Sequence, residues 1–188
     1  MLEKIIAADK QLFIFLNGLG SETYDNLWLA ITHQFNWMPF YLLVFYLLQK
    51  KIGWKNTLII LLFVGALITL GDQTANLFKG IFKRLRPCSD PEIKDVIRIV
   101  KSSDTFSFFS GHATSSMATM FFVFMIFRKY YRFAFLLFIF PLFFAYSRIY
   151  LGLHFPTDIL TGYAVGASYG FLFYKLHQYL QPKYFPLV

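Results

Sequence analysis

Long apolar runs separated by short polar segments divide this chain, and their lengths constrain its fold more than any other feature. They cover residues 27–48, 57–78, 110–127, 133–150 and 159–174. Each is comparable with the roughly 20 helical residues that cross the hydrocarbon core of a bilayer. Because 57% of the 188 residues are hydrophobic and only 15% are charged, a soluble domain of this size could not bury the apolar surface. The pattern predicts an all-α fold, a polytopic membrane helix bundle with five to six transmembrane helices.

The N-terminal segment and the first apolar run deviate from this simple pattern. Residues 1–20 alternate apolar with charged positions, which predicts an amphipathic helix at the membrane interface, with an imperfect span as the alternative. Asp9 and Lys10 interrupt its apolar stretch, which is not typical of a cleaved signal peptide. Trp37 and Pro39 lie near the middle of the first run and predict a break or a kink there.

Alternating crossings assign the polar segments to two sides of the membrane. Segments 49–56, 128–132 and 175–188 share one side, which carries eight Lys and Arg residues and no acid. Segments 79–109 and 149–158 share the other side, where cations and acids are mixed. Counting cations alone gives a tie under the positive-inside rule. We predict a multi-pass protein of the cell membrane, that is, the inner or cytoplasmic membrane. The acid-free side is placed in the cytoplasm and the second side on the extracytoplasmic face.

Charge and cysteine content narrow the class of partners. The net charge of +8 suits anionic lipid headgroups or a phosphate-bearing substrate. We predict no nucleic-acid partner, because the charges cluster between apolar runs. Cys88 is the single cysteine, which excludes an internal disulfide framework and a cysteine-based metal cluster. Without repeats or low-complexity linkers, residues 1–188 are predicted to form one membrane-embedded domain.

Residues suited to phosphoryl transfer gather in three stretches of the second side. These stretches lie at the ends of predicted spans, so a helix bundle would bring them together in one pocket at the membrane surface. Cationic side chains there could neutralise the three equatorial oxygens that carry charge in the transition state. The candidates for phosphate binding are Lys79, Arg86, Ser110, Gly111 and Arg148, and the candidates for catalysis are His112, His154 and Asp158.

Each catalytic candidate has a chemical reason for its position. Ser110, Gly111 and His112 are predicted to open a helix, where free N–H groups bind anions and glycine permits close approach. His154 could attack phosphorus as a neutral imidazole, while Asp158, four residues on, holds the other ring nitrogen. His112 could then protonate the departing lipid oxygen.

The spacing of these residues resembles the three-part signature of a known family. Lys79-x6-Arg86-Pro87, then Ser110-Gly111-His112, then Ser147-Arg148-x5-His154-x3-Asp158 is similar to the signature of the type 2 phosphatidic acid phosphatase superfamily, the membrane lipid phosphate phosphatases. The resemblance implies the roles given above for all eight residues, a phosphohistidine intermediate on His154 that water hydrolyses, and neither a metal ion nor a cofactor. One residue departs from the pattern: Phe109 stands where the family usually has proline before Ser-Gly-His, which affects loop geometry rather than chemistry.

The roles of several charged residues near these motifs can be interpreted in two ways. Lys83 and Arg84 are read mainly as interfacial charges that reach lipid headgroups. Asp72 either pairs within the bundle or supports the site. Apolar residues recur at helical spacing within 92–101, which predicts a surface helix resting on the bilayer or, alternatively, a lid over the site.

The sequence predicts the class of substrate, a lipid phosphate, but does not select one lipid. The short loops and the run from Ser147 to Pro156 look similar to bacterial undecaprenyl-diphosphate phosphatases, so undecaprenyl diphosphate is the first expectation. Phosphatidylglycerophosphate, phosphatidic acid and lipid A are the alternatives. A lipid phosphotransferase and a non-catalytic lipid-binding or transport protein are the competing functions, and the oligomeric state stays open.

Overall fold

The computed structural model describes residues 2–184, and helices dominate it. No residue of that range lies in a β-strand, so the predicted all-α class is confirmed. The α-helices are α1 (Leu2–Gly18), α2 (Asp25–Ile31), α3 (Met38–Phe82), α4 (Gly111–Phe127), α5 (Ile139–Tyr150) and α6 (Pro156–Tyr184). Short 3-10 turns add η1 (Glu22–Tyr24), η2 (Gln34–Trp37), η3 (Pro87–Ser89) and η4 (Ala134–Phe138).

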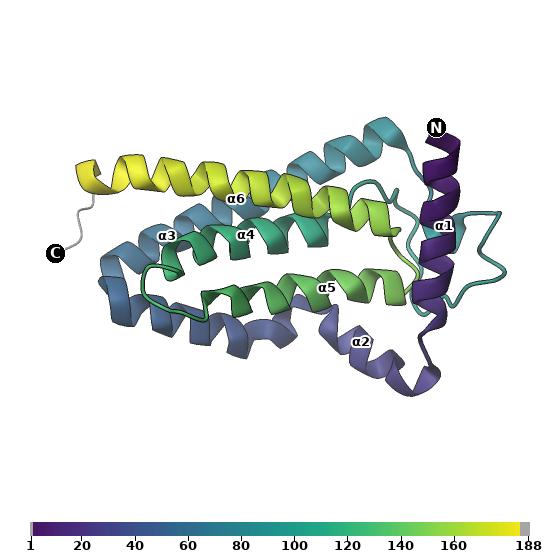
Figure 1. Ribbon diagram of the computed structural model, residues 1–188, viewed down its shortest axis with the longest axis horizontal. Helices are drawn as coiled ribbons and strands as arrows, with labels where there is room; N and C mark the ends of the chain where they lie inside the picture. Colours follow the sequence, from purple (N-terminus) through teal and green to yellow (C-terminus); the bar gives the residue numbers. More distant parts are fainter. Residues whose placement is uncertain (1, 185–188) are drawn as a thin grey trace.

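Helix α3 runs the length of the bundle twice. Gly53 lies inside it with φ 74° and ψ 170°, a conformation that favours glycine because it has no Cβ. Figure 1 shows the chain doubling back at one end of the bundle within α3. Pro39 stands in the first turn of α3, where proline is tolerated, and the preceding residues form α2 and η2. The break predicted near Trp37 and Pro39 is therefore confirmed.

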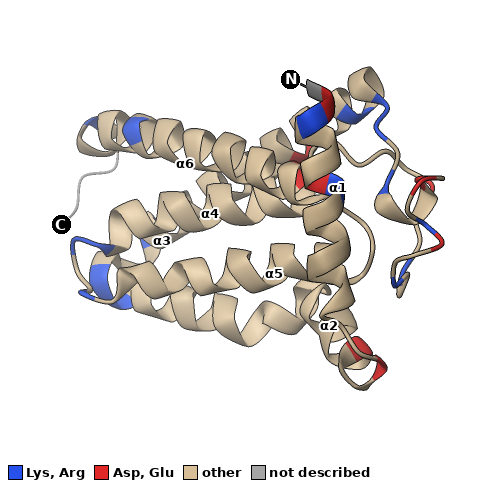
Figure 2. Ribbon diagram, turned by 45° about the vertical axis from the view of Figure 1, so that its right-hand side comes forward, with Lys and Arg blue, Asp and Glu red and all other residues tan. Residues whose placement is uncertain are grey.

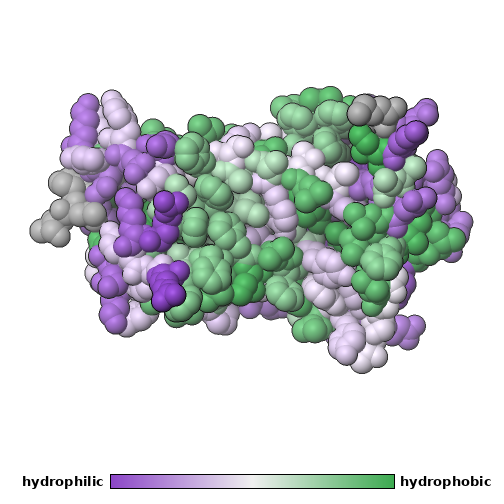
Figure 3. All heavy atoms as spheres, viewed as in Figure 1, coloured by the Kyte–Doolittle hydropathy of each residue, from purple (hydrophilic) through white to green (hydrophobic). Residues whose placement is uncertain are grey.

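The outer surface of the bundle is apolar along its middle. The segment from Gln34 to Ser89 contains a helix long and apolar enough to cross a membrane, and Gly111–Phe127 and Ala134–Tyr150 are shorter apolar helices. Figure 3 shows hydrophobic atoms along the middle of the molecule and hydrophilic atoms toward both ends. Large apolar side chains such as Leu62 of α3 and Leu160 of α6 are exposed, as expected for contact with lipid.

The two ends of the bundle carry different charges. Figure 1 places the bend of α3, the α4–α5 connection and the end of α6 together at one end. Figure 2 shows Lys and Arg without Asp or Glu at that end, and a mixture of both signs at the other. The polar segments therefore share ends as the alternating crossings predicted.

Helix α1 lies across the end that carries mixed charge, rather than along the bundle (Figure 1). Its buried residues, Asp9, Phe13 and Asn17, recur every four positions and face the protein. Ile5 and Phe15 point outward and are more than half exposed. The inner face of α1 thus combines the polar Asp9 and Asn17 with the apolar Phe13, while exposed apolar side chains on the outer face suit a helix lying on a bilayer.

The segment 92–101 contains turns rather than the predicted surface helix, so that prediction is wrong. Asn17 of α1 binds the backbone of Arg98 on both sides: its Oδ1 accepts from the N–H at 2.8 Å, and its Nδ2 donates to the carbonyl at 3.1 Å. The Arg98 guanidinium also pairs with Asp25 at 2.9 Å. Because these contacts use backbone groups that a helix would need, the segment is fixed as a loop against α1 and α2.

Helices α4 and α6 pack so closely that glycine is required between them. Gly162, Gly166 and Gly170 recur every four residues along α6 and face the backbone of α4. A Cβ at Gly162 would lie 2.8 Å from the carbonyl oxygen of Ser110, and one at Gly166 would overlap the carbonyl oxygen of Thr114. Such small-residue stripes let membrane helices approach backbone to backbone.

We expect Gly166→Ala to lower stability by about 1–3 kcal/mol, the usual effect of overpacking, because the backbone of α4 must move away. Gly65→Ala is the matched control, since a Cβ at that position of α3 meets nothing within 4 Å. Thermal unfolding in detergent measures both. Equal unfolding temperatures for the two variants would contradict the close α4–α6 contact.

Candidate active site

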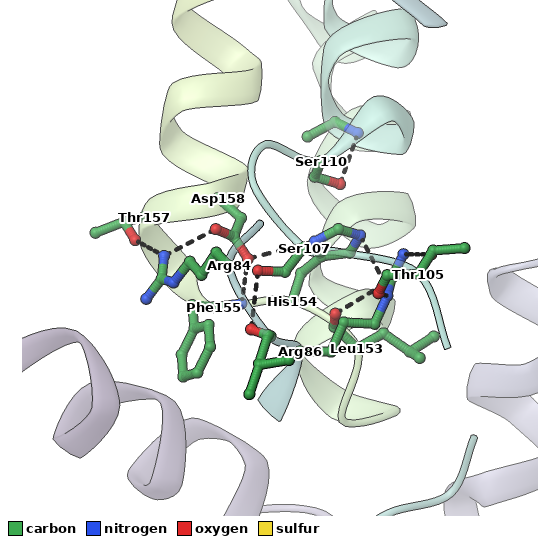
Figure 4. Close-up of polar contacts among 12 residues, drawn as sticks. Arg84, Arg86, Thr105, Ser107, Ser110, Leu153, His154, Phe155, Thr157 and Asp158 are labelled. Atoms are coloured by element: carbon green, nitrogen blue, oxygen red, sulfur yellow. Dashed lines mark hydrogen bonds and ion pairs between the residues drawn. The ribbon is translucent and has the colours of Figure 1, made fainter. Parts of the chain in front are cut away.

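The three motif stretches meet at the mixed-charge end of the bundle, and hydrogen bonds join them directly (Figure 4). Arg86, in the loop after α3, places Nη1 3.1 Å from Nε2 of His154, in the loop before α6. The N–H of Ser110, at the start of α4, donates to the backbone carbonyl of Asp158 at 3.1 Å. Residues far apart in the sequence therefore surround one small volume, as the bundle topology predicted.

The His154 ring is oriented by a short turn and by Asp158. The carbonyl of Arg148 accepts from the N–H groups of Leu153 at 2.9 Å and of His154 at 3.2 Å, which fixes the loop between α5 and α6. Oδ2 of Asp158 lies 3.4 Å from Nδ1 of His154 and accepts from the Phe155 N–H at 2.9 Å. With Nδ1 facing the carboxylate, the lone pair of Nε2 points toward Arg86.

Burial keeps the His154 imidazole neutral. The side chain is only 1% exposed. Burial lowers the pKa of His154 to about 4, although the neighbouring Asp158 carboxylate opposes this shift. A neutral ring has a free lone pair at neutral pH, which is the form that can attack an electrophile.

Arg86 is held in place by main-chain and hydroxyl oxygens rather than by an acid. It donates through Nε to the carbonyl of Thr105 at 2.8 Å, through Nη2 to the Thr105 hydroxyl at 2.8 Å, and through Nη1 to the carbonyl of Leu153 at 2.9 Å. Because no carboxylate within residues 2–184 forms an ion pair with Arg86, its positive charge stays available to an anion. Thr105 could not be identified as a partner of Arg86 from the sequence, because it lies in an irregular loop.

Arg148 is buried with part of its donor capacity unused. Its Nη1 donates to the Thr32 hydroxyl at 2.8 Å, while its buried Nε has no hydrogen-bond partner within residues 2–184. A buried unsatisfied guanidinium donor is costly, and an anionic ligand would relieve that cost. Thr32, between α2 and η2, was not identified from the sequence either.

The Ser110-Gly111-His112 stretch begins α4, as predicted. Ser110 is the N-cap, and its Oγ accepts from the Ala113 N–H at 3.4 Å. The first N–H groups of a helix have no intrahelical acceptor, so Gly111 and His112 present donors at this end. The His112 ring stacks on Phe144 with centroids 5.0 Å apart. Phe109 is buried against Phe78, so aromatic packing holds the loop where the family usually has proline.

Lys79 and Asp72 complete the surroundings of the cluster from α3. Lys79 lies close enough to Arg86 and Arg148 for their positive charges to repel one another. The same three cations also interact electrostatically with His112. Asp72 accepts a hydrogen bond from the Ser115 hydroxyl at 2.9 Å. Asp72 therefore has a partner in the bundle and also lies beside His112 in the cavity wall.

An apolar cavity of about 280 Å³ extends from this end into the bundle, between both halves of α3, α4 and α5. Gly111, His112 and Asp72 line its polar part, and apolar side chains such as Leu48 and Val123 line the rest. Its volume is close to that of small ligand pockets, at about 300 Å³. A lipid tail placed there would have its polar end next to His112.

Arg84 is a functional candidate that the sequence interpretation missed. It was read as an interfacial cation, but its Nη1 donates to Asp158 Oδ1 at 2.8 Å and its Nη2 to Asp9 at 2.6 Å. Lys83 ends α3 in the left-handed conformation, with φ 46°, which turns the following residue back toward the protein. Lys83 itself stays exposed, as expected for an interfacial charge.

Known proteins match both the sequence and the fold. A model of the PAP2 superfamily matches residues 56–182. A lipid A 4'-phosphatase of Bacteroides thetaiotaomicron is 36% identical over 93% of this chain and 79% of its own length. A second lipid A 4'-phosphatase, of Porphyromonas gingivalis, is 30% identical over 97% of this chain and 78% of its own length.

Two crystal structures share the arrangement of helices. The transmembrane PAP2-type phosphatidylglycerolphosphate phosphatase of Bacillus subtilis superposes with a TM-score of 0.71 at 20% identity, covering 97% of this chain and 90% of that one. LpxE of Aquifex aeolicus superposes with a TM-score of 0.64 at 22% identity, covering 88% and 93%. At these identities the match supports the fold.

The fold is a bundle of membrane helices, and a buried cluster of cations and imidazoles lies at one end. These features are typical of a membrane protein that binds an anionic group of a lipid. The chain belongs to the PAP2 superfamily, as the three motifs indicated.

Proposed function

We propose that this protein is a membrane lipid phosphatase that removes a phosphate from a lipid A-type substrate, an acylated and phosphorylated sugar. The observation that carries the phosphatase activity is the cluster of His154, Asp158, Arg86 and Arg148, together with an apolar cavity whose wall includes His112. Both curated relatives, which match nearly the whole chain, are named lipid A 4'-phosphatase, and this name supports the choice of lipid. Lipid A therefore replaces undecaprenyl diphosphate, for which these relatives give no support.

In the proposed reaction, the phosphate oxygens pair with Lys79, Arg86 and Arg148. Arg86 donates to a phosphate oxygen in place of Nε2 of His154, which frees the lone pair of that nitrogen. Nε2 then forms a bond to phosphorus while the bond from phosphorus to the lipid oxygen breaks. His112, which takes up a proton from water when the negative phosphate binds beside it, gives that proton to the lipid oxygen.

The second half of the reaction returns the protein to its starting state. A water molecule loses a proton to His112 and attacks phosphorus, and the bond from phosphorus to Nε2 breaks. Asp158 stabilises the charge on the His154 ring in both halves through Nδ1. Ser110 and the N–H groups of Gly111 and His112 contribute donors to the phosphate. We propose that no metal ion or cofactor takes part.

A panel of lipid phosphates in detergent tests this function. The panel holds lipid A, undecaprenyl diphosphate, phosphatidylglycerophosphate and phosphatidic acid, each with excess chelator. We expect phosphate release to be fastest from lipid A, with mass spectrometry showing loss of one sugar phosphate. A higher kcat/KM for another member would overturn the choice of lipid, and abolition by chelator would overturn the metal-free reaction.

The pH dependence should follow the depressed pKa of His154. Because the neutral ring is the nucleophile, kcat/KM should hold as pH falls through 6.5, the ordinary imidazole value, and decline near pH 4. The substrate phosphate also ionises in this pH range. Its ionisation is measured by phosphorus NMR in the same micelles, and the pH profile of kcat/KM is corrected for it. An acidic limb at about pH 6.5 would contradict a buried neutral nucleophile.

We propose that the site faces away from the cytoplasm in the cytoplasmic membrane, since the opposite end is rich in cations and free of acids (Figure 2). Lys94→Cys in a Cys88→Ser background gives one exposed thiol at the site end. A membrane-impermeant maleimide should label it in intact spheroplasts. Labelling only after lysis would reverse the orientation.

A further inference from the structure

A chain of charged groups connects helix α1 to the His154 ring. Arg84 lies between two buried carboxylates: its Nη2 is 2.6 Å from Asp9, on α1, and its Nη1 is 2.8 Å from Asp158, in the first turn of α6. Asp158 in turn lies 3.4 Å from Nδ1 of His154. Both carboxylates are at most 5% exposed, so their charges are balanced mainly by protein groups.

The Arg84 guanidinium is fixed on every side. Its plane lies over the Phe155 ring, 4.0 Å from the centroid. Its Nη1 also donates to the Thr157 hydroxyl at 2.8 Å, and Figure 4 shows it between Thr157 and Asp158. Asp9 holds the same element from the other side, since its Oδ1 accepts from the Thr157 N–H at 3.0 Å. Arg84 thus bridges Asp9 and Asp158 with the two nitrogens of one rigid fork, a geometry that the single ammonium of a lysine could reproduce only in part.

Each oxygen of the Asp158 carboxylate has a different partner. Oδ1 receives Arg84, and Oδ2 receives the Phe155 N–H and faces His154. Without Arg84, Oδ1 would lose its cation and the carboxylate would be free to rotate away from Nδ1. Asp9 would keep its hydrogen bonds from Thr157 but would lose its cation, and two buried carboxylates without a cation between them repel each other.

From this geometry we infer that Asp9 and Arg84 are positioning residues, which hold Asp158 and through it orient the His154 ring for attack on phosphorus. The inference rests on the proposed phosphatase reaction. It gives the docking of α1 a role in catalysis. Asp9 lies outside the three motifs, and Arg84 stands at one of the unspecified positions between Lys79 and Arg86.

Steady-state kinetics on lipid A tests the inference with matched pairs of variants. Arg84→Gln should lower kcat by about 10- to 100-fold with little change in KM, because misplacing a reacting group by about 1 Å has an effect of that order. Arg84→Lys should recover part of the loss. Lys83→Gln, which removes the adjacent exposed cation, should keep full activity. Asp9→Asn should lower kcat less than Arg84→Gln, with Glu3→Gln, an exposed acid on the same helix, as its control.

The Asp158→Asn background separates positioning from general structural support. If Arg84 acts through Asp158, then Arg84→Gln should lower kcat little further once Asp158 is already changed. A full additional loss in that background would overturn the inference. So would unchanged kcat in both Arg84→Gln and Asp9→Asn.

Nitrogen NMR of histidine-labelled protein gives a readout that needs no substrate. His154 is assigned by the signal missing in His154→Gln. The unaltered protein should show the Nδ1-protonated form of the ring, and both Arg84→Gln and Asp9→Asn should shift that signal, whereas Lys83→Gln should not. Lack of phosphate release by the unaltered protein would count against the proposed function, while an unshifted His154 signal would overturn this inference alone.

Discussion

Replacing His154 by glutamine is expected to lower phosphate release from lipid A by about two to four decades, which corresponds to about 3–5 kcal/mol in activation free energy. The side chain volume is nearly kept, but the nitrogen that bonds to phosphorus is lost. KM should change little, because Arg86 and Arg148, the proposed phosphate ligands, remain in place.

His177→Gln is the control, because this histidine packs against Phe63 and Phe122 at the opposite end of α6. The His177→Gln variant loses an imidazole from the same helix bundle but keeps every residue of the site, so its activity should be retained. Turnover by His154→Gln within about tenfold of the unaltered protein would contradict the assignment of the nucleophile.

Replacing His112 by glutamine should lower turnover of lipid A by about two to four decades as well, but through a different step. A sugar oxygen leaves poorly without a proton, and His112 is the group placed to supply it. A nitrophenyl ester of phosphate has a leaving group that needs no proton. The variant should therefore form the phosphohistidine from this ester at nearly normal rate.

Release of the phosphohistidine still needs His112 as a base for water. The variant should then show a burst of nitrophenol, equal to the amount of protein, followed by slow turnover. The same variant with lipid A should show no burst. Equal losses on both substrates, with no burst on either, would contradict the role of His112.

The motifs could be predicted from the sequence because their geometry is local or follows from simple topology. Asp158 follows His154 by four residues, so a turn at the start of α6 suffices to bring the two side chains together. Because consecutive helices cross the membrane in alternating directions, the order of the apolar runs was sufficient to predict that the three stretches share one end of the bundle. The apolar run from residue 110 predicted a helix start there, and the structure begins α4 at Gly111 with Ser110 as its N-cap.

The contacts that support the motifs could not be predicted, because they join residues distant in the chain. Arg84 lies 75 residues from Asp9 and 74 from Asp158, and no pattern in one sequence links them. Its neighbour Lys83 has the same charge yet stays exposed, so charge alone did not distinguish the two. Asn17 likewise fixes Arg98 from 81 residues away, and this long-range contact outweighs the local helical pattern of 92–101.

The central claim is that His112, His154 and three cations from separate helix ends surround one phosphorus atom. An experimental structure with bound orthovanadate, which adopts the five-coordinate geometry of phosphorus in the reaction, tests this most directly. We expect vanadium bonded to Nε2 of His154, His112 beside the opposite axial oxygen, and Lys79, Arg86 and Arg148 on the equatorial oxygens. Vanadate bound elsewhere, or a His112 ring too far away to reach its axial oxygen, would contradict the account.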